Sequence, residues 1–304
     1  VEKGERVLGS DLPLYPPMSD RLAALGIDVL PGFDGRNLPP AVDRVVVGNL
    51  AGKDNPELVA ALERGLPVSS MPETLRTEFL AGRHPVVVAG THGKTTTTAL
   101  AAWLLAAAGE APGYLVGGEP RNFASPSAIG AGSAFVVEGD EYSTSWADKG
   151  PKFLHYAPET FVLTSVEFDH ADLYAGLDAV KEAFRRGVAI VPPRGRVVAC
   201  GDDPNVRDVL GPARARVVLY GLGDAPDLDL RAEEIEEGPD GTRFLVRPRG
   251  RAPFPVLSPL AGRHNVANAL ASLAAGEGLG VPLERLAAGL PSFLGVKRRL
   301  ELRG

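Results

Sequence analysis

The sequence predicts an α/β fold in two domains, and three features of the chain support this prediction. Short runs of β-branched residues alternate with stretches of helical period, which is typical of parallel strands connected by helices. A strand-like run at residues 85–89 leads through a glycine-rich turn into a helical pattern at residues 94–108. The length of 304 residues indicates two domains, since one domain usually takes about 150 residues.

The first domain is expected to span residues 1–83. Its predicted elements are at most one short strand within residues 1–11, a helix at 19–25, a buried strand at 44–47 and a helix at 56–64. Gly26 follows the first of these helices. The second has Asn55 as its N-cap, a proline at its first position and Gly65 after its last residue.

The second domain is expected to span residues 84–296. Strands are predicted at 85–89, 134–138, 161–164, 196–199, 216–220, 228–236 and 242–247. Helices are predicted at 94–108, 177–186, 265–275 and 283–288, with a short helix between the strands at 196–199 and 216–220. The turn Gly238-Pro239-Asp240-Gly241 predicts an antiparallel hairpin beside a mainly parallel sheet.

Composition and charge exclude several classes of protein. Hydrophobic residues make up 44% of the chain and charged residues 23%, so it should fold around a large core. A net charge of −6 without basic blocks argues against nonspecific nucleic-acid binding. The longest apolar run, residues 99–108, is shorter than the roughly 20 residues that cross a membrane, and no signal peptide is evident. Cys200 is alone and cannot form an internal disulfide. We expect a cytoplasmic protein that binds small molecules and neither nucleic acid nor membrane.

The glycine-rich turn at residues 90–93 predicts a phosphate site. A strand, a glycine turn and a helix in this order direct backbone N–H groups at one point, where Lys94 adds a cation and Thr95 a hydroxyl for Mg²⁺. The usual P-loop has four residues between its glycines, whereas Gly90 and Gly93 enclose two. The alternative is an ordinary strand-turn-helix with a solvent-facing lysine.

A second group of polar residues follows the strand at 134–138, where Glu138, Asp140 and Glu141 come together. The carboxyl ends of parallel strands face the ligand crevice, so these carboxylates are expected beside the phosphates with Mg²⁺ between them. A solvated acidic loop is the alternative. The choice between Glu138 and Glu141 as metal ligand stays open, although Glu138 is closer to the sheet.

Three further residues or groups stand in positions that could contact a nucleotide. His170 follows the strand at 161–164 and could coordinate a second Mg²⁺ or contact the γ-phosphate, with Asp169 or Asp172 orienting it. Asn265 and Asn268 lie three residues apart on one face of a predicted helix and could read the edge of a purine, although a capped helix explains them equally. The run Lys297-Arg298-Arg299 could close over phosphates or be a solvated linker.

In these motifs the chain resembles the Mur ligases, the ATP-dependent amide-forming enzymes of bacterial cell-wall synthesis. The segment Gly90-Thr91-His92-Gly93-Lys94-Thr95-Thr96-Thr97 matches the family's own form of the P-loop, which removes the spacing objection. Four more motifs follow in family order: Glu138-Gly139-Asp140-Glu141, Glu167-Phe168-Asp169-His170, Gly262-Arg263-His264-Asn265-Val266-Ala267-Asn268 and Gly295-Val296-Lys297-Arg298-Arg299-Leu300.

The resemblance implies a three-domain enzyme of which this chain is a fragment. Residues 1–83 would be a Rossmann-like UDP-sugar domain without its first strand and glycine loop, and residues 84–296 the central ATP-binding domain. Residues 297–304, whose alternating pattern resembles the beginning of a strand, would start the C-terminal amine-binding domain. The ends agree with this expectation, since Val1 is not a methionine.

The resemblance also implies an activity. Residues 15–20 and 140–156 resemble the family members that join the murein tripeptide L-Ala-γ-D-Glu-meso-diaminopimelate to UDP-N-acetylmuramate in cell-wall recycling, through an acyl phosphate. The family member that adds L-alanine to the same sugar is the alternative. A P-loop ATPase, or a nucleotide-binding module without ligation, is the alternative from another class.

The implied cofactors are ATP and Mg²⁺. Lys94 would bind the β- and γ-phosphates, Thr95 and Glu138 one Mg²⁺, and His170 a second, so Lys94, Glu138 and His170 are the expected catalytic residues. The other expected ATP contacts are Gly90, Thr91, His92, Gly93, Thr96, His264, Asn265, Asn268 and Arg299. Ser10 and Asp11 would belong to the UDP-sugar site. Some family members carry a carbamylated lysine after the histidine motif; Lys181 is nearby, but no residue is assigned to that role.

Overall fold

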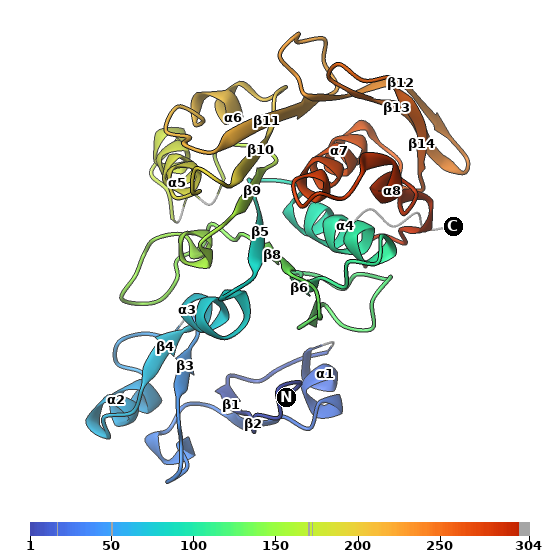
Figure 1. The fold of residues 1–304 in the computed structure, drawn as a ribbon. Helices are drawn as coiled ribbons and strands as arrows, with labels where there is room; N and C mark the ends of the chain where they lie inside the picture. The colour runs from blue at the N-terminus through green and yellow to red at the C-terminus, as the bar shows by residue number, and fades with distance from the viewer. Residues whose placement is uncertain (17, 50, 170, 172, 298–304) are drawn as a thin grey trace. The chain divides into compact units, whose positions relative to one another are not determined.

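The computed structural model describes the chain except residues 17, 50, 170, 172 and 298–304. It divides into two compact units (Figure 1). The first unit consists of Val1–Thr74 together with Ser143–Lys149, and the second consists of Leu75–Tyr142 with Gly150–Gly304. Each unit has its own sheet or sheets.

The first unit contains two small parallel strand pairs, each connected through a helix. Strand β1 (Leu8–Asp11) pairs with β2 (Asp28–Pro31) through α1 (Met18–Ala24), and β3 (Val45–Val47) pairs with β4 (Val68–Ser70) through α2 (Pro56–Glu63). The 3₁₀ turn η1 (Gly35–Asn37) precedes β3. The predicted helices and the strand at 44–47 are confirmed. Strands β2 and β4 were not predicted, because each is only three or four residues long and carries polar residues.

Helix α2 begins as its sequence predicts. The side chain of Asn55 accepts hydrogen bonds from the backbone N–H groups of Glu57 at 3.0 Å and Leu58 at 3.2 Å. These two N–H groups have no partner inside the helix, so the cap satisfies donors that would otherwise lack a protein acceptor. Pro56 occupies the first turn, where its missing N–H is not needed.

The second unit is built on one large sheet. Within the described residues its strands lie in the order β14-β13-β12-β11-β10-β9-β5-β8-β6-β7. The strands are β5 (His84–Ala89), β6 (Gly113–Leu115), β7 (Ser127–Ala128), β8 (Ala134–Glu138), β9 (Thr160–Leu163), β10 (Arg196–Cys200), β11 (Arg216–Gly221), β12 (Leu230–Gly238), β13 (Gly241–Pro248) and β14 (Phe254–Ser258). From β6 to β12 neighbouring strands are parallel, whereas β12, β13 and β14 are antiparallel and β7 runs antiparallel to β6. This confirms the mainly parallel sheet and the hairpin turning at residues 238–241.

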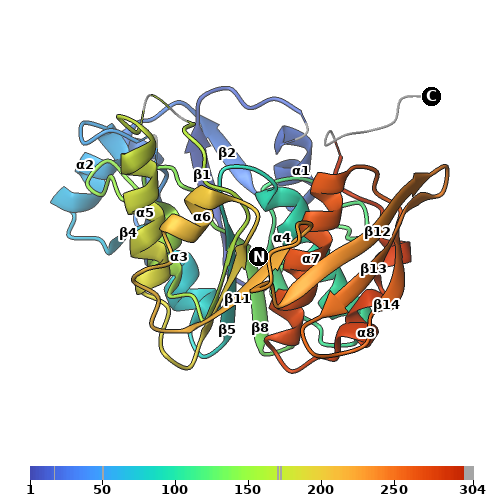
Figure 2. The same cartoon turned by 90° about the horizontal axis from the view of Figure 1, so that it is seen from above.

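Helices cover both faces of this sheet (Figure 2). One face packs against α4 (Lys94–Ala107), α7 (Arg263–Glu277) and α8 (Leu283–Ala287), and the other against α5 (Leu177–Ala189), α6 (Pro204–Asp208) and η3 (Lys152–Tyr156). Shorter turns of helix are α3 (Met71–Leu75), η2 (Arg76–Leu80) and η4 (Leu290–Ser292).

Alternation along the strands produces the two cores. On β5, Val86 and Val88 belong to the cluster with α4 and α7, while Val87 and Ala89 belong to the cluster with α5. Successive side chains of a strand point to opposite faces, so a strand that is covered on both faces has a continuous run of apolar residues in its sequence. That is why the core strands were predicted, and why the two-residue β7 and the glycine-containing β6 were not.

None of the helices in the described part of the chain has the length and hydropathy that a membrane crossing requires. The strand predicted to begin at residues 299–303 lies outside the described residues.

Candidate nucleotide-binding site

The glycine turn lies at the carboxyl edge of the large sheet. Strand β5 lies between β8 and β9 in the sheet. After β5 the chain forms β8 on one side and then crosses over to form β9 on the other. A crevice opens at such a switch point in open α/β sheets, and ligands bind there. Helix α4 starts directly after the turn, so its first N–H groups and the positive end of its dipole are at this edge.

The two glycines of the turn are required by its backbone and its neighbours. Gly90 has φ 125°, and a Cβ there would stand 2.9 Å from the backbone nitrogen of Ser165. Gly93 has φ 81°, and a Cβ there would stand 2.6 Å from Oδ1 of Asn268. Residues with a side chain rarely adopt such φ values, and neither position has space for one. The turn is therefore held close to both the loop after β9 and helix α7.

Lys94 is held by three acceptors. Its Nζ donates to the carbonyl oxygens of Gly90 at 2.6 Å and Thr91 at 3.0 Å, and it pairs with the Glu141 carboxylate at 3.0 Å. The side chain of Lys94 is 14% exposed and that of Glu141 is 4% exposed, so the ion pair is largely shielded from water. A cation is thus fixed at the glycine turn and held there by a buried carboxylate.

The next residue, Thr95, faces the other glutamate. Its Oγ1 donates to Oε1 of Glu138 at 2.9 Å, and Oε2 of Glu138 accepts the backbone N–H of Gly117 at 2.8 Å. A hydroxyl and a carboxylate oxygen are hard donors of the kind Mg²⁺ prefers, and Mg²⁺ usually keeps several waters beside one or two protein ligands. The two residues therefore fit magnesium. In the part of the chain that the structure describes, no group of three or more His, Cys, Asp or Glu side chains is arranged to hold a metal.

The loop after β9 is attached to the glycine turn by hydrogen bonds. Ser165 accepts the N–H of Thr91 at its carbonyl at 3.0 Å and the N–H of His92 at its Oγ at 2.9 Å. The Oγ1 of Thr91 accepts the N–H of Glu167 at 2.9 Å, which brings the Glu167 carboxylate to 3.6 Å from the His92 ring. The predicted motif at residues 167–170 therefore begins against the P-loop. His170 and Asp172 lie outside the described residues, and the role of His170 stays a prediction.

Asn265 and Asn268 form a buried network between α7 and α4. Asn268 donates to Oδ1 of Asn265 at 3.2 Å and accepts from Oγ1 of Thr97 at 3.1 Å, while Asn265 donates to the carbonyl of Ala261 at 2.7 Å. These bonds fasten the first turn of α7 to α4 beside Gly93. The side chain of neighbouring His264 is exposed. The purine contact predicted for these three residues stays a prediction.

Several residues at this edge were not predicted. Tyr174 donates its hydroxyl to the carbonyl of Glu141 at 2.8 Å, and burial, followed by the nearby charge of Glu141, raises the pKa of that hydroxyl to about 12. Lys152 pairs with Asp140 at 2.8 Å, and Asp203 accepts the N–H of Val166 at 2.9 Å. Gly117, two residues after β6, was also missed, because β6 itself was not predicted.

The residues predicted for a UDP-sugar lie in the first unit. Ser10 donates its hydroxyl to Glu57, whose other carboxylate oxygen accepts the side-chain amide of Asn37 at 2.6 Å. Asp11 accepts the N–H of Leu12 at 2.7 Å and lines a cavity of about 470 Å³ beside β1, β2 and α1. Arg299, predicted to reach the nucleotide, lies outside the described residues.

Two family models match the sequence. The model for the Mur ligase middle domain matches residues 88–276, and the model for the Mur ligase family, catalytic domain matches residues 1–82. Together they cover most of the chain, and the gap between them, residues 83–87, falls at the start of β5.

Individual relatives and solved structures agree with these matches. UDP-N-acetylmuramate--L-alanyl-gamma-D-glutamyl-meso-2,6-diaminoheptandioate ligase of Escherichia coli (strain K12) is 38% identical over 99% of this chain and 65% of that protein. UDP-N-acetylmuramate--L-alanine ligase of Rubrobacter xylanophilus is 40% identical over 100% of this chain and 64% of that protein. The crystal structure of UDP-N-acetylmuramate:L-alanyl-gamma-D-glutamyl-meso-diaminopimelate ligase from Neisseria meningitides superposes with a TM-score of 0.88 at 40% identity, covering 98% of this chain and 93% of that one. The chain thus spans slightly less than two thirds of the two curated relatives.

Proposed function

Because this chain belongs to the Mur ligase family, we propose that it carries the nucleotide and sugar sites of an ATP-dependent ligase. The reaction joins the murein tripeptide L-Ala-γ-D-Glu-meso-diaminopimelate to UDP-N-acetylmuramate in cell-wall recycling. The sugar's lactyl carboxylate takes the γ-phosphoryl group of ATP to form an acyl phosphate, and the tripeptide amine then displaces phosphate to give the amide. The names of the Escherichia coli and Neisseria relatives support the tripeptide as acceptor.

The observation that carries the proposal is the arrangement at the start of α4. Lys94 and Thr95 are neighbours in the chain, yet each faces a different glutamate, Lys94 facing Glu141 and Thr95 facing Glu138. A cation for phosphate oxygens and a pair of oxygen donors for a divalent ion therefore lie side by side at a helix N-terminus. Transfer of a phosphoryl group to a carboxylate brings two anions together, and positioned positive charge is what lowers its barrier.

The roles that we propose for the individual residues follow from these contacts. Lys94 exchanges the carbonyl oxygens of Gly90 and Thr91 for the β- and γ-phosphate oxygens, and Glu141 keeps its ammonium aimed at the turn. Thr95 and Glu138 would hold Mg²⁺. When bound there, the ion supplies positive charge that screens the phosphate oxygens from the incoming carboxylate.

The other expected contacts complete the proposal. The N–H groups of the glycine turn and of Thr96 bind phosphate oxygens, and His170 holds a second Mg²⁺. His264, Asn265 and Asn268 form the side of the site that takes adenine, Arg299 reaches the nucleotide, and Ser10 and Asp11 belong to the sugar site. We place the sugar domain at residues 1–83, the ATP-binding domain at 84–296 and the beginning of the amine-binding domain at 297–304.

The test is ADP release by the full-length product of the gene that encodes this chain, measured in a coupled spectrophotometric assay. It is run with UDP-N-acetylmuramate and Mg²⁺, and it compares the tripeptide with L-alanine as acceptor. Tripeptide-dependent release that is lost in Lys94→Ala supports the proposal. Lys53→Ala, at an exposed lysine of the first unit, is the matched control and should keep wild-type release.

Two other results would replace the proposal. Release that depends on L-alanine alone would assign the alanine-adding activity, which the 40% identity to the Rubrobacter relative favours. ATP hydrolysis that responds to neither acceptor nor to the sugar would indicate a P-loop ATPase.

A further inference from the structure

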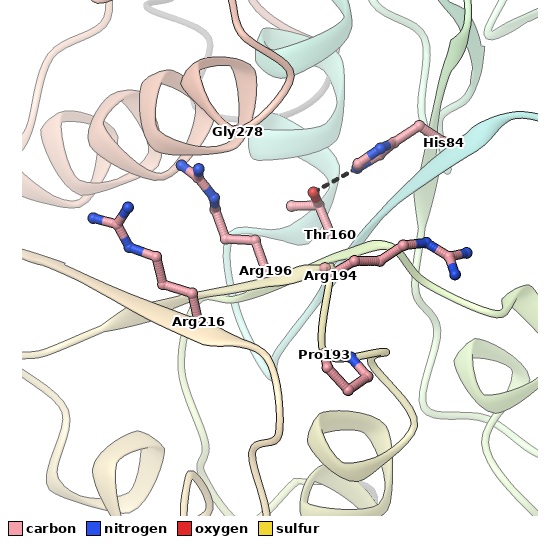
Figure 3. A pocket seen from close by; sticks show the side chains of 8 residues that line it. His84, Thr160, Pro193, Arg194, Arg196, Arg216 and Gly278 are labelled. Atoms are coloured by element: carbon pink, nitrogen blue, oxygen red, sulfur yellow. Dashed lines mark hydrogen bonds between the residues drawn. The ribbon is translucent and has the colours of Figure 1, made fainter.

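A second polar cavity lies at the opposite end of the same strands from the glycine turn. It has a volume of about 190 Å³, and its walls come from the amino ends of β5, β9, β10 and β11 and from the end of α7 (Figure 3). The lining residues with charged or hydrogen-bonding side chains are His84, Thr160, Arg194, Arg196 and Arg216. Its residues are separate from those assigned above to ATP, magnesium or the sugar.

Strand register explains how these side chains come together. Val162, Val198 and Val218 stand in register on β9, β10 and β11, and all are buried under α4 and α7. Two residues earlier on each strand the same face carries Thr160, Arg196 and Arg216, again in register. Because side chains two apart on a strand share a face, the apolar layer under the helices ends in a row of one hydroxyl and two guanidinium groups.

Two adjacent arginines in register repel each other, and like charges directly opposite on neighbouring strands destabilise a sheet. Burial lowers the pKa of Arg196, and the charge of Arg216 lowers it further. Among the described residues, no carboxylate lies within ion-pair distance of either arginine. The two acids that act on Arg196 from farther away are each paired with another arginine, Glu277 with Arg251 at 2.5 Å and Asp229 with Arg249 at 3.5 Å.

The other groups in the cavity add no charge. Arg194 is neutralised by Glu159, whose carboxylate lies 2.6 Å from its guanidinium. Burial lowers the pKa of His84, so its ring is neutral near pH 7, and its Nε2 lies 2.8 Å from the hydroxyl of Thr160. The cavity therefore carries about two positive charges from Arg196 and Arg216. Gly278 leaves room for them, since a Cβ there would stand 3.2 Å from Nε of Arg196.

We propose that this cavity is an anion site that binds a small phosphate dianion, either inorganic phosphate or a phosphate monoester. Guanidinium groups match the oxygens of phosphate in geometry as well as charge, and two of them balance a dianion. The volume holds about six molecules of water at ~30 Å³ each, which is enough for a phosphate group and a small substituent and too little for a nucleoside triphosphate. The site is distinct from the P-loop because it lies at the other edge of the sheet.

Isothermal titration calorimetry of the 304-residue chain tests the proposal. Potassium phosphate and glycerol 3-phosphate are titrated at constant ionic strength, which distinguishes the free anion from a monoester, and malonate serves as a dicarboxylate probe. We expect saturable phosphate binding with a Kd below about 1 mM that persists in Lys94→Ala. In Arg196→Gln and in Arg216→Gln the affinity should fall at least about tenfold, because each removes a charged hydrogen-bonding group. Arg243→Gln, at an exposed arginine of β13, should change it less than about twofold.

The same experiment includes one control for folding and one for phosphate bound at the P-loop. Without phosphate, Arg196→Gln should melt at the wild-type temperature or above it, because the substitution removes the repulsion between Arg196 and Arg216. Arg216 is at an exposed strand end, so Arg216→Gln still tests the site if Arg196→Gln does not fold. Phosphate affinity that falls in Lys94→Ala and not in the arginine variants would place the anion at the P-loop and overturn the proposal. Absence of saturable binding, or tighter binding of malonate than of phosphate, would overturn it as well.

Discussion

The buried ion pair between Lys94 and Glu141 gives the most demanding prediction. Removing Lys94 leaves the Glu141 carboxylate, which is 4% exposed, without its cation. Removing the charge of Glu141 by Glu141→Gln leaves Lys94 with the carbonyl oxygens of Gly90 and Thr91. The two single variants should therefore differ in their effect on stability.

The expected magnitudes follow from this geometry. Breaking a buried pair by removing one partner costs about 3–5 kcal/mol, and the 14% exposure of Lys94 places Lys94→Ala near the lower value, about 3 kcal/mol. Glu141→Gln should cost about 1.5 kcal/mol, because the ammonium keeps two acceptors. The double variant leaves no buried charge and should cost about 2 kcal/mol. The coupling energy between the two positions is then about 2.5 kcal/mol.

Urea unfolding at pH 7.5 measures these values, with Trp103 in α4 as the fluorescent probe and Trp146→Phe as the common background. The matched control is Lys181→Ala. Lys181 lies 3.1 Å from Asp208, but that carboxylate is 48% exposed, so the variant should lose less than about 1 kcal/mol. Equal losses in Lys94→Ala and Lys181→Ala, or a coupling energy below about 0.5 kcal/mol, would refute the reasoning from burial.

Three further predictions concern the P-loop and the opposite edge of the sheet. Thr95→Val removes the hydroxyl that faces Glu138 and should weaken magnesium-dependent ADP binding about tenfold, measured with a fluorescent nucleotide analogue, with little change when EDTA is present. Gly93→Ala puts a Cβ at φ 81° and 2.6 Å from Oδ1 of Asn268, so urea unfolding should show a loss of about 1–3 kcal/mol. His84 has a pKa below the usual 6.5 because it is buried, so the unfolded chain binds its proton first and stability should fall as pH drops below 6.5. The free energy of unfolding should therefore decrease less from pH 7 to pH 5 in His84→Gln than in the wild type. The difference between the two should be at most about 1.4 kcal/mol per pH unit.

Each of these variants has a matched control. Thr77→Val, at a threonine of η2, should leave nucleotide binding unchanged, and an equal loss with and without EDTA would contradict the metal role of Thr95. Gly52→Ala should be neutral because a Cβ there has open space, and a comparable loss at both glycines would contradict the steric argument. His264→Gln, at an exposed histidine of α7, is the control for His84→Gln and should lose less than about 0.5 kcal/mol of stability at pH 7.

Local chemistry made most of the secondary structure predictable from the sequence. The cap at Asn55, the turn at residues 238–241 and the strand-turn-helix around Gly90 each depend on residues within a few positions of one another. Propensity and turn chemistry act over that range, so the sequence alone determined these elements and the α/β class. Strands of two to four residues, such as β6 and β7, exist because a neighbouring strand pairs with them, and their own residues give little signal.

The candidate site also combines features that local sequence predicts with features that depend on contacts between distant segments. The sequence predicted that Lys94 and Thr95 follow a phosphate-binding turn, and it favoured Glu138 over Glu141 as the metal ligand only because Glu138 is closer to the sheet. Their different partners depend on how β8 stands in register with β5, across more than forty residues of chain.

Tertiary packing alone placed Asn268 against Gly93 and set Arg196 beside Arg216. In each case the contact joins residues far apart in sequence, and its energy comes from burial and charge at close approach. Sequence order specifies which groups are present, whereas the register of the sheet and the packing of its helices decide which of them meet.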